Sequence, residues 1–305
     1  SYWPRYGEEN YTIVLPFEKD FDHMKSTQWM QRNWMHSLTF SILYVVVIFG
    51  GRRLMQNLKP FSLNTPLMLW NAALATFSIM GFLRMTPEWV WSWSAEGNSL
   101  KSSICGASYS MEVSGFWTNL FILSKVPELV DTVFIVLRKR PLLFLHWYHH
   151  ITVLVYCWHS YQEHTGAGRW FIWMNYGVHA VMYSYYAARC LKIRTPKFLA
   201  MFITILQISQ MVVGVTISVA VYRIKSSGES CQQSWENLLL GSTIYFSYFI
   251  LFCNFFYHTY LKKSNRYAVL EKKETEAVDS TKEHQNGVKS EQKGGTTRRR
   301  VQKAE

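Results

Sequence analysis

The sequence predicts an all-α membrane protein with seven transmembrane helices, and three observations support this fold class. Seven stretches are long and apolar enough to cross a hydrocarbon core of about 30 Å. Lys and Arg residues cluster in the short loops after alternate stretches. The chain of 305 residues is 49% apolar and only 17% charged. Its mean hydropathy is near zero because the value averages an apolar membrane body with a polar C-terminal segment.

The expected spans follow one another along residues 34–262, which form the membrane body. Their approximate limits are 34–51, 66–83, 116–136, 142–161, 170–188, 198–222 and 236–261. The third and seventh are the least uniform, because they contain polar groups. Residues 1–33 lack the basic start and apolar core of a signal peptide, so no cleavable leader is expected. Residues 263–305 are polar and mixed in charge, which predicts a disordered tail.

The distribution of basic residues predicts the orientation of the chain. The loops after the first, third and fifth spans carry about twice as many Lys and Arg residues as those after the second, fourth and sixth. Because basic loops face the cytosol, we expect a lumenal N-terminus and a cytosolic C-terminus. The net charge of +12 favours a face toward anionic lipid or a polyanionic substrate, and nucleic acid is not an expected partner.

Two features of the expected lumenal segments agree with this orientation. The one glycosylation sequon is Asn10-Tyr11-Thr12, which makes Asn10 a candidate glycosylation site. Cys105 and Cys231 lie in the loops after the second and sixth spans, whereas the other three cysteines lie in or near spans. Since the lumen is oxidising, we predict a Cys105–Cys231 disulfide, the alternative being two free thiols.

Ionisable residues recur inside the third span, where desolvation makes them costly. Lys125, Glu128 and Asp131 follow one another at intervals of three, over about a third of the helix circumference. Pro127 is expected to bend the helix there and to free backbone groups. A buried ion pair without a chemical role is the alternative for Lys125 and Glu128.

Polar groups also line one face of each of the next three spans. In the fourth span, LHWYHH places His146, His149 and His150 on one helix face, because residues three and four apart are neighbours. Further polar residues step by four in the fifth span and by three in the sixth. They are Asn175, His179 and Tyr183, then Thr204, Gln207 and Gln210. Hydrogen bonding between helices is the alternative for the sixth-span residues.

The polar groups of these spans share one expected depth. His149, His179, Glu128 and Gln207 each lie about ten residues from the basic cluster at the cytosolic end of their span, or roughly 15 Å. A common depth on four helices predicts a single buried polar site, lined by the third to sixth spans and open to the cytosol.

Three classes of protein are alternatives to consider for such a site: a di-iron enzyme, a receptor and a carrier. A neutral imidazole can act as a metal ligand, a general base or a nucleophile. A di-iron desaturase or hydroxylase would need more histidine boxes than the single HxxHH of this chain, so no metal is expected. A seven-helix receptor has no need of stacked histidines, and a carrier more often shows repeat symmetry or broken helices, which we do not find.

Several motifs, in order, carry a closer resemblance. They are KVPELVDTVFIVLRKR, LHWYHHITVL, MNYGVHAVMYSYY and TILQISQ. The chain from about 34 to 260 resembles the very-long-chain fatty acid elongases of the endoplasmic reticulum membrane, which are 3-ketoacyl-CoA synthases. The resemblance implies seven helices, six of them forming a barrel around an acyl tunnel that is closed at its lumenal end. It also fits a lumenal cysteine bridge, and it is strongest to the branch acting on saturated and monounsaturated chains of about palmitate length.

The family reaction implied by this resemblance condenses acyl-CoA with malonyl-CoA to give 3-ketoacyl-CoA, CO2 and CoA. It needs no cofactor beyond malonyl-CoA as co-substrate. We hypothesise that His149 attacks the thioester and that His146, His150 and His179 orient it, move protons or stabilise the enolate oxygen. Candidate carbonyl ligands are Asn175, Tyr183, Gln207 and Gln210, with Lys125, Glu128 and Asp131 fixing charges and tautomers. Candidate CoA phosphate ligands are Arg138, Lys139, Arg140, Lys262, Lys263 and Arg266.

The expected partners follow from the same resemblance. They are the lipid bilayer, acyl-CoA and malonyl-CoA, and the ketoacyl reductase, hydroxyacyl dehydratase and enoyl reductase of the elongation cycle. Whether the protein forms a homodimer is left open by the sequence.

Overall fold

The structure, a computed structural model, describes residues 5–262. Its described part is helical and contains no strand, which confirms the all-α prediction. The α-helices are α1 (Pro16–Lys19), α2 (His23–Asn33), α3 (His36–Leu54), α4 (Asn64–Ser94), α5 (Leu100–Cys105), α6 (Glu112–Ser124), α7 (Val130–Leu137), α8 (Phe144–Tyr161), α9 (Gly168–Cys190), α10 (Lys197–Ser226) and α11 (Trp235–Phe256). Short 3-10 turns lie at η1 (Glu8–Asn10), η2 (Met55–Asn57), η3 (Ser108–Ser110) and η4 (Pro127–Leu129), and η5 (Tyr257–Leu261) is a π-helical turn. The polar tail predicted at 263–305 lies outside the described residues.

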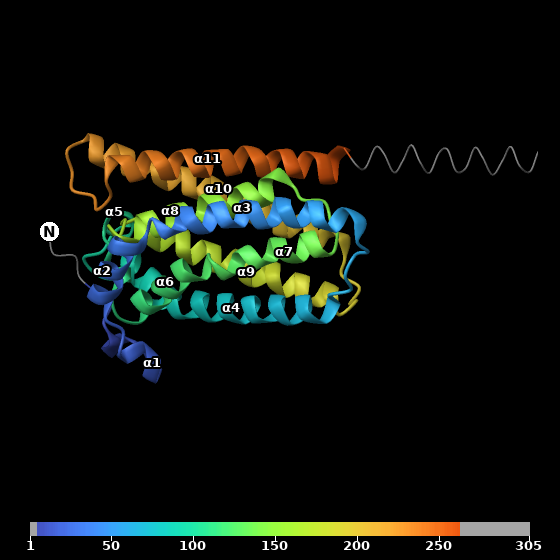
Figure 1. Cartoon of the computed structure of the whole chain (residues 1–305). Coiled ribbons are helices and arrows are strands. Elements are labelled where there is room, and N and C mark those ends of the chain that lie inside the picture. The colour runs from blue at the N-terminus through green and yellow to red at the C-terminus, as the bar shows by residue number, and fades with distance from the viewer. Residues whose placement is uncertain (1–4, 263–305) are drawn as a thin grey trace, which may run out of the picture. The chain divides into compact units, whose positions relative to one another are not determined.

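The chain divides into two compact units, Ser1–Cys253 and Asn254–Glu305. Within the first unit, Figure 1 shows the long helices roughly aligned with one another, with the chain passing back and forth between the two ends of the bundle. The most extensive contact joins α4 to α9, and α3 packs against α7 and α8. We call the end that holds α5 and the α10–α11 loop the disulfide end. The opposite end, with the loops after α3, α7 and α9, is the basic end.

The expected spans lie on helical segments, the third on two of them, and four of the described helices are long and apolar enough to cross a membrane. These are His36–Asn57, Asn64–Ser94, Phe198–Ser226 and Trp235–Leu261. The helices at the third, fourth and fifth expected spans are shorter or less apolar because they carry the ionisable and histidine residues singled out above. Large apolar side chains of α3 are exposed, among them Ile42 at 67% and Val46 at 62%, as expected for a surface in contact with lipid tails.

The close contact between α4 and α9 depends on two glycines. A Cβ at Gly81 of α4 would lie 2.3 Å from the ring of Tyr176 on α9, and one at Gly177 of α9 would lie 2.9 Å from the ring of Phe82 on α4. Each glycine therefore receives an aromatic ring from the facing helix. Small residues at such positions let neighbouring membrane helices approach closely.

The third expected span is broken in its middle, as Pro127 predicts. Because Pro127 has no N–H, the α-helical ladder stops at Ser124 and a 3-10 turn follows at η4 before α7 begins. Side chains three residues apart lie almost above one another in such a turn. Lys125 and Glu128 meet for this reason, and the site described below is built around the pair.

A buried charge network closes the disulfide end. Arg169 is 1% exposed and Glu88 is 0% exposed, and the Arg169 guanidinium donates to both carboxylate oxygens of Glu88 at 2.7–3.0 Å. It also donates to the Ser103 carbonyl at 2.6 Å and to the Ser108 hydroxyl at 2.6 Å. Beside it lies the Cys105–Cys231 disulfide, which confirms the predicted bridge.

The segment before the first span folds against this end. Glu18 of α1 is buried, and its carboxylate accepts hydrogen bonds from Arg84 at 2.6 and 2.8 Å and from the Trp117 indole at 2.7 Å. Burial opposes ionisation of Glu18, but these bonds outweigh burial and lower the pKa of the carboxyl. Asn10 and Thr12 of the sequon are exposed, so the predicted glycosylation site is accessible.

His164, in the turn after α8, predicts how stability depends on pH. Thr27 donates to the His23 carbonyl at 2.7 Å, so at 2.6 Å its oxygen accepts the Nε2–H of His164. The buried Nδ1 of His164 has no partner in the described part of the chain. Burial, with a smaller contribution from His23, lowers the pKa of His164 to about 4. Protonation would therefore put an unpaired N–H in the interior.

We expect the protein to lose stability as the pH falls from 6.5 toward 4. The unfolded chain binds the proton first, so the contribution of neutral His164 is complete above pH 6.5 and declines below it. The loss is about 1.4 kcal/mol per pH unit, or about 2 kcal/mol at pH 5. The check is the apparent unfolding temperature in detergent at pH 7 and pH 5. His164→Gln should flatten the dependence; equal declines in both proteins would contradict this assignment.

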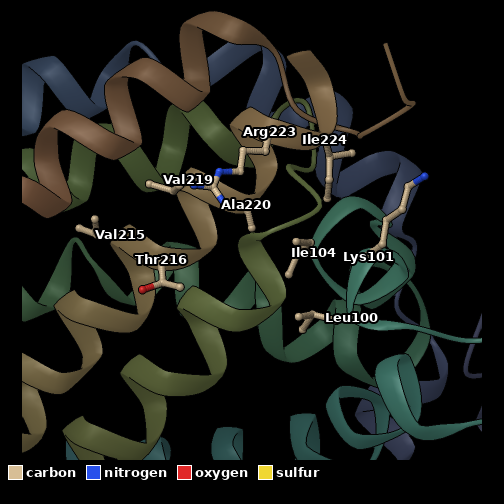
Figure 2. Close-up of a pocket in the computed structure, with 9 residues that line it drawn as sticks. All are labelled: Leu100, Lys101, Ile104, Val215, Thr216, Val219, Ala220, Arg223 and Ile224. Carbon is tan, nitrogen blue, oxygen red and sulfur yellow. The ribbon is translucent and has the colours of Figure 1, made fainter. Parts of the chain in front are cut away.

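A groove of about 590 Å³ lies between α5 and α10 near the disulfide end (Figure 2). Its walls are mostly apolar, with Leu100 and Ile104 on α5 facing Val219 and Ala220 on α10, and Arg223 at its edge. None of the predicted site residues lines it, so the candidate site lies elsewhere.

Candidate active site

The buried ion pair at the broken span is the first component of the site. Lys125 Nζ lies 2.8 Å from Glu128 Oε1, and the Ser124 hydroxyl donates to the same oxygen at 2.8 Å. Lys125 is 2% exposed and Glu128 3%, and the ammonium lies 3.9 Å from the Phe121 ring centroid. Because the pair is buried, water screens its charges only weakly, and their electrostatic interactions with neighbouring side chains are strong.

Three histidines on α8 form the second component. His146 and His150 are one turn apart, with ring centroids 4.5 Å from each other, and the His149 and His150 centroids are 5.6 Å apart. The structure therefore confirms the prediction that the three histidines share one face of the helix. The three rings nevertheless have different neighbours on the two sides of that face.

His146 faces α7 and, through α7, α3. Its Nε2 lies 2.9 Å from the Thr132 hydroxyl, which lies 2.7 Å from the Tyr44 hydroxyl. Tyr44 is 4% exposed and Thr132 0% exposed, so this chain of hydrogen bonds is shielded from water.

His149 faces α11 instead. Its ring centroid lies 5.0 Å from that of Tyr248, whose hydroxyl lies 2.6 Å from the Thr152 hydroxyl and within 3.4 Å of the His149 carbonyl. Tyr248 thus holds the backbone and the ring of His149 from the side opposite to Thr132.

The third component comes from α9. Asn175 Nδ2 lies 3.4 Å from His179 Nε2, and the side-chain oxygen of Asn175, Oδ1, is buried without a partner among the described residues. The next turn holds Tyr183, whose ring centroid lies 5.3 Å from that of His179. The hydroxyl of Tyr183 donates to Asp131 at 2.7 Å. The other oxygen of Asp131 accepts the Trp70 indole N–H at 2.5 Å.

Asp131 therefore links α4, α7 and α9, and it makes no hydrogen bond to Lys125. Tyr183 was a candidate ligand for a substrate carbonyl, but in this structure its proton is directed to Asp131. Its position favours a role in holding His179.

These components converge. His149 interacts electrostatically with His179, Lys125, His146 and Glu128. His150 interacts in the same way with His146, His149, Lys125 and His179. His149, His150 and His179 are thus all within electrostatic range of the buried Lys125 ammonium, and His146 lies beside His150. Within the described part of the chain, no group of three His, Cys, Asp or Glu side chains is arranged to hold a metal ion.

The sixth-span residues lie at the edge of this group. Gln207 Nε2 lies 3.4 Å from the Met182 sulfur on α9, one turn from His179. Gln210 is buried and interacts with the Tyr245 hydroxyl of α11. Thr204 donates to the carbonyl of Ala200 in its own helix. The glutamines thus contact both neighbouring helices.

The basic end holds three of the candidate phosphate ligands, Arg138, Lys139 and Arg140. Lys139 Nζ donates to the carbonyls of Gln56 and Leu58 at 3.1 Å, and Arg138 donates to Asn64 at 3.2 Å. Both residues join the loops after α3 and α7 in this structure. Arg140 is exposed. Lys263 and Arg266 lie outside the described residues.

Four residues of the site were missed by reading the sequence. Trp70, Thr132 and Tyr248 each contact a predicted site residue. Tyr44 joins the site through its hydrogen bond to Thr132. Thr132 follows Asp131 in a polar stretch and carried a weak signal. The three aromatic residues stand among many aromatics in apolar runs, so only their tertiary contacts distinguish them.

Comparisons with known proteins bear on this arrangement. The family described as "ELO: GNS1/SUR4 family" matches residues 29–268. A Caenorhabditis elegans protein, "Putative fatty acid elongase 3", is 60% identical over all of this chain and 99% of its own length. "Very long chain fatty acid elongase 6" of Drosophila melanogaster is 50% identical over 83% of this chain and 80% of its own length. The Homo sapiens protein of that name is 48% identical over 82% of this chain and 94% of its own length.

Proposed function

The chain belongs to the ELO (GNS1/SUR4) family, and from that membership we propose that it condenses a fatty acyl-CoA with malonyl-CoA. The products are 3-ketoacyl-CoA, CO2 and CoA, so the enzyme is an acyltransferase of fatty acid elongation. The observation that carries the proposal is the set of four histidines on α8 and α9, three of which interact electrostatically with the buried Lys125 of the Lys125–Glu128 pair. Family membership sets aside the receptor, carrier and di-iron alternatives.

The first half-reaction transfers the acyl group to His149. An imidazole nitrogen attacks the thioester carbonyl, the C–N bond forms and the C–S bond breaks. The ring proton passes to the departing CoA thiolate, which leaves a neutral acyl-imidazole. The placement of His149 supports this assignment, because it interacts with His179, Lys125 and Glu128, whereas Nε2 of His146 is engaged by Thr132. Buried surroundings would protect the activated acyl group from hydrolysis.

The second half-reaction uses malonyl-CoA. Loss of CO2 leaves an electron pair that forms the new C–C bond, the C–N bond to His149 breaks, and the imidazole regains a proton from the medium. The developing enolate oxygen carries negative charge. The Lys125 ammonium, His150 and His179 are fixed donors suited to that charge, and a preorganised donor set of this kind supplies much of the stabilisation in acyl transfer.

The expected membrane arrangement supports the same function. We place three further crossings at α6–α7, α8 and α9, with six of the seven spans around an acyl tunnel. The disulfide end is lumenal and the basic end cytosolic, because disulfides form in oxidising compartments and basic loops stay in the cytosol. The endoplasmic reticulum membrane satisfies both conditions. CoA phosphates would meet the basic end, and the other three enzymes of the elongation cycle are the expected partners.

The test of the proposed function is a reconstituted condensation. The purified chain, in liposomes, is given malonyl-CoA with saturated and monounsaturated acyl-CoAs of increasing length. We expect one CO2 for each 3-ketoacyl-CoA, with the highest rate near palmitate length, measured by trapped CO2 and by mass spectrometry. Acyl-CoA consumption that yields only free fatty acid and CoA, with or without malonyl-CoA, would contradict the proposal.

A further inference from the structure

A hydrogen-bonded chain connects the first span to the histidines. The Tyr44 hydroxyl of α3 lies 2.7 Å from Thr132 Oγ1 of α7, and Thr132 Oγ1 lies 2.9 Å from Nε2 of His146 on α8. Neither hydroxyl has another hydrogen-bond partner in residues 5–262. The first span was not among the four helices expected to line the site, so its contribution to the site is new information.

Counting the available protons indicates which atom donates in each of these two hydrogen bonds. If Tyr44 donates to Thr132 and Thr132 donates to His146, both hydroxyl protons are used and Nε2 accepts. If the chain ran the other way, the Tyr44 proton would be left without an acceptor at a site where the residue is 4% exposed. A buried donor without a partner costs about 1–3 kcal/mol, whereas a vacant lone pair on the Tyr44 oxygen costs less. The first direction is therefore favoured.

That direction fixes the tautomer of His146. With Nε2 accepting, the ring proton of the neutral imidazole must be on Nδ1. A hydrogen bond to one ring nitrogen commonly sets the state of the other in this way. The His146 ring also stacks edge-on against His150, with centroids 4.5 Å apart. The orientation of His146 thus limits the orientation of His150.

We propose that Tyr44 and Thr132 are positioning residues that hold His146 as its Nδ1–H tautomer and thereby align His150. This inference rests on the proposed function, since the aligned imidazoles are those assigned to proton movement. Tyr44 gives α3 a function besides contact with lipid. One face of this helix carries exposed apolar residues such as Ile42 and Val46, while Tyr44 on the other face reaches the site.

The test compares substitutions at Thr132. Thr132→Val keeps the shape of the side chain but removes the donor. We expect kcat to fall about 10-fold to 100-fold, by analogy with the loss of outer partners of metal-binding histidines. KM for both substrates should change less than about twofold, because substrate contacts are retained. Thr132→Ser restores the hydroxyl and should stay near wild type. In Tyr44→Phe, kcat should fall several-fold. Thr132 can still donate to His146, but its hydroxyl is no longer oriented by a hydrogen bond from Tyr44.

The matched control is Thr118→Val. Thr118 is 1% exposed, like Thr132, and its hydroxyl has no partner among the described residues. Removing it deletes no hydrogen bond, so kcat should be unchanged. A Thr132→Val enzyme with wild-type kcat, or a Thr132→Ser enzyme as impaired as Thr132→Val, would overturn the proposal.

A second readout separates this proposal from the proposed function. Nitrogen-15 spectra of histidine-labelled protein distinguish the two neutral tautomers without any substrate. We expect the His146 resonances, assigned by their absence from His146→Gln, to report Nδ1–H in the wild type and a mixture in Thr132→Val. An Nε2–H signal in the wild type would refute the tautomer assignment even if condensation is observed. Absence of condensation with the expected tautomer would refute only the proposed function.

Discussion

Alanine at position 149 should remove the covalent acyl adduct and lower the condensation rate by about 1000-fold or more, the scale of losses seen when a nucleophile is deleted. The physical reason is that no other ring has the surroundings of His149. Nε2 of His146 is engaged by Thr132, and Nε2 of His179 lies beside Asn175. The measurement is intact mass of the purified protein after addition of acyl-CoA alone. Wild type should gain one acyl group, and His149→Ala none.

The matched control for His149 is His159→Ala. His159 lies on the same helix, near the disulfide end, with its ring 5.1 Å from Trp34 and its Nδ1 without a partner among the described residues. It contacts none of the site residues, so the adduct should form at the wild-type level. A normal adduct in His149→Ala would show that another histidine is the nucleophile. His150→Ala and His179→Ala would then identify which one.

The second large effect concerns stability. Arg169→Met leaves Glu88 as an unpaired buried carboxylate, and breaking a buried pair in this way costs roughly 3–5 kcal/mol. It also removes the donors to Ser103 and Ser108. For a domain of this size, such a loss lowers the unfolding temperature by about 10 °C. Thermal unfolding followed by size-exclusion chromatography in detergent measures the change.

Two further variants make the stability result specific. Glu88→Gln combined with Arg169→Met should recover part of the loss, because no buried charge is left unpaired. Lys101→Met breaks the ion pair with Glu229 at the same end, where both side chains are 40–50% exposed, and should leave the unfolding temperature unchanged. An Arg169→Met protein with the unfolding temperature of the wild type would show that the network contributes little to stability.

Much of the architecture follows from local rules that act within one helix. Long apolar runs predict helices, spacings of three and four predict the common histidine face, and Pro127 predicts the break that brings Lys125 to Glu128. The histidine face and the break at Pro127 depend on backbone geometry over fewer than about ten residues. The Cys105–Cys231 bridge followed from compartment and loop position, which are also readable from sequence.

What the sequence did not reveal depends on contacts between distant segments. The helix expected to end near residue 83 continues to Ser94 in α4, because Glu18 and Arg169 neutralise its charged residues Arg84 and Glu88. Likewise, Tyr44 acquires its role only when α3 packs on α7. Periodicity cannot report such pairings, since neither partner carries a pattern of its own.

The cysteine bridge also sets an order of events during synthesis. Its two sulfurs are separated by 126 residues, so at 5–20 residues per second Cys105 is made roughly 6–25 s before its partner. Throughout that interval the thiol of Cys105 is open to oxidoreductases of the compartment in which it emerges. A nascent chain that stalls before Cys231 can never complete the bond. The intact Cys105–Cys231 bridge is therefore a record, kept in the protein itself, that the chain has been made at least as far as Cys231.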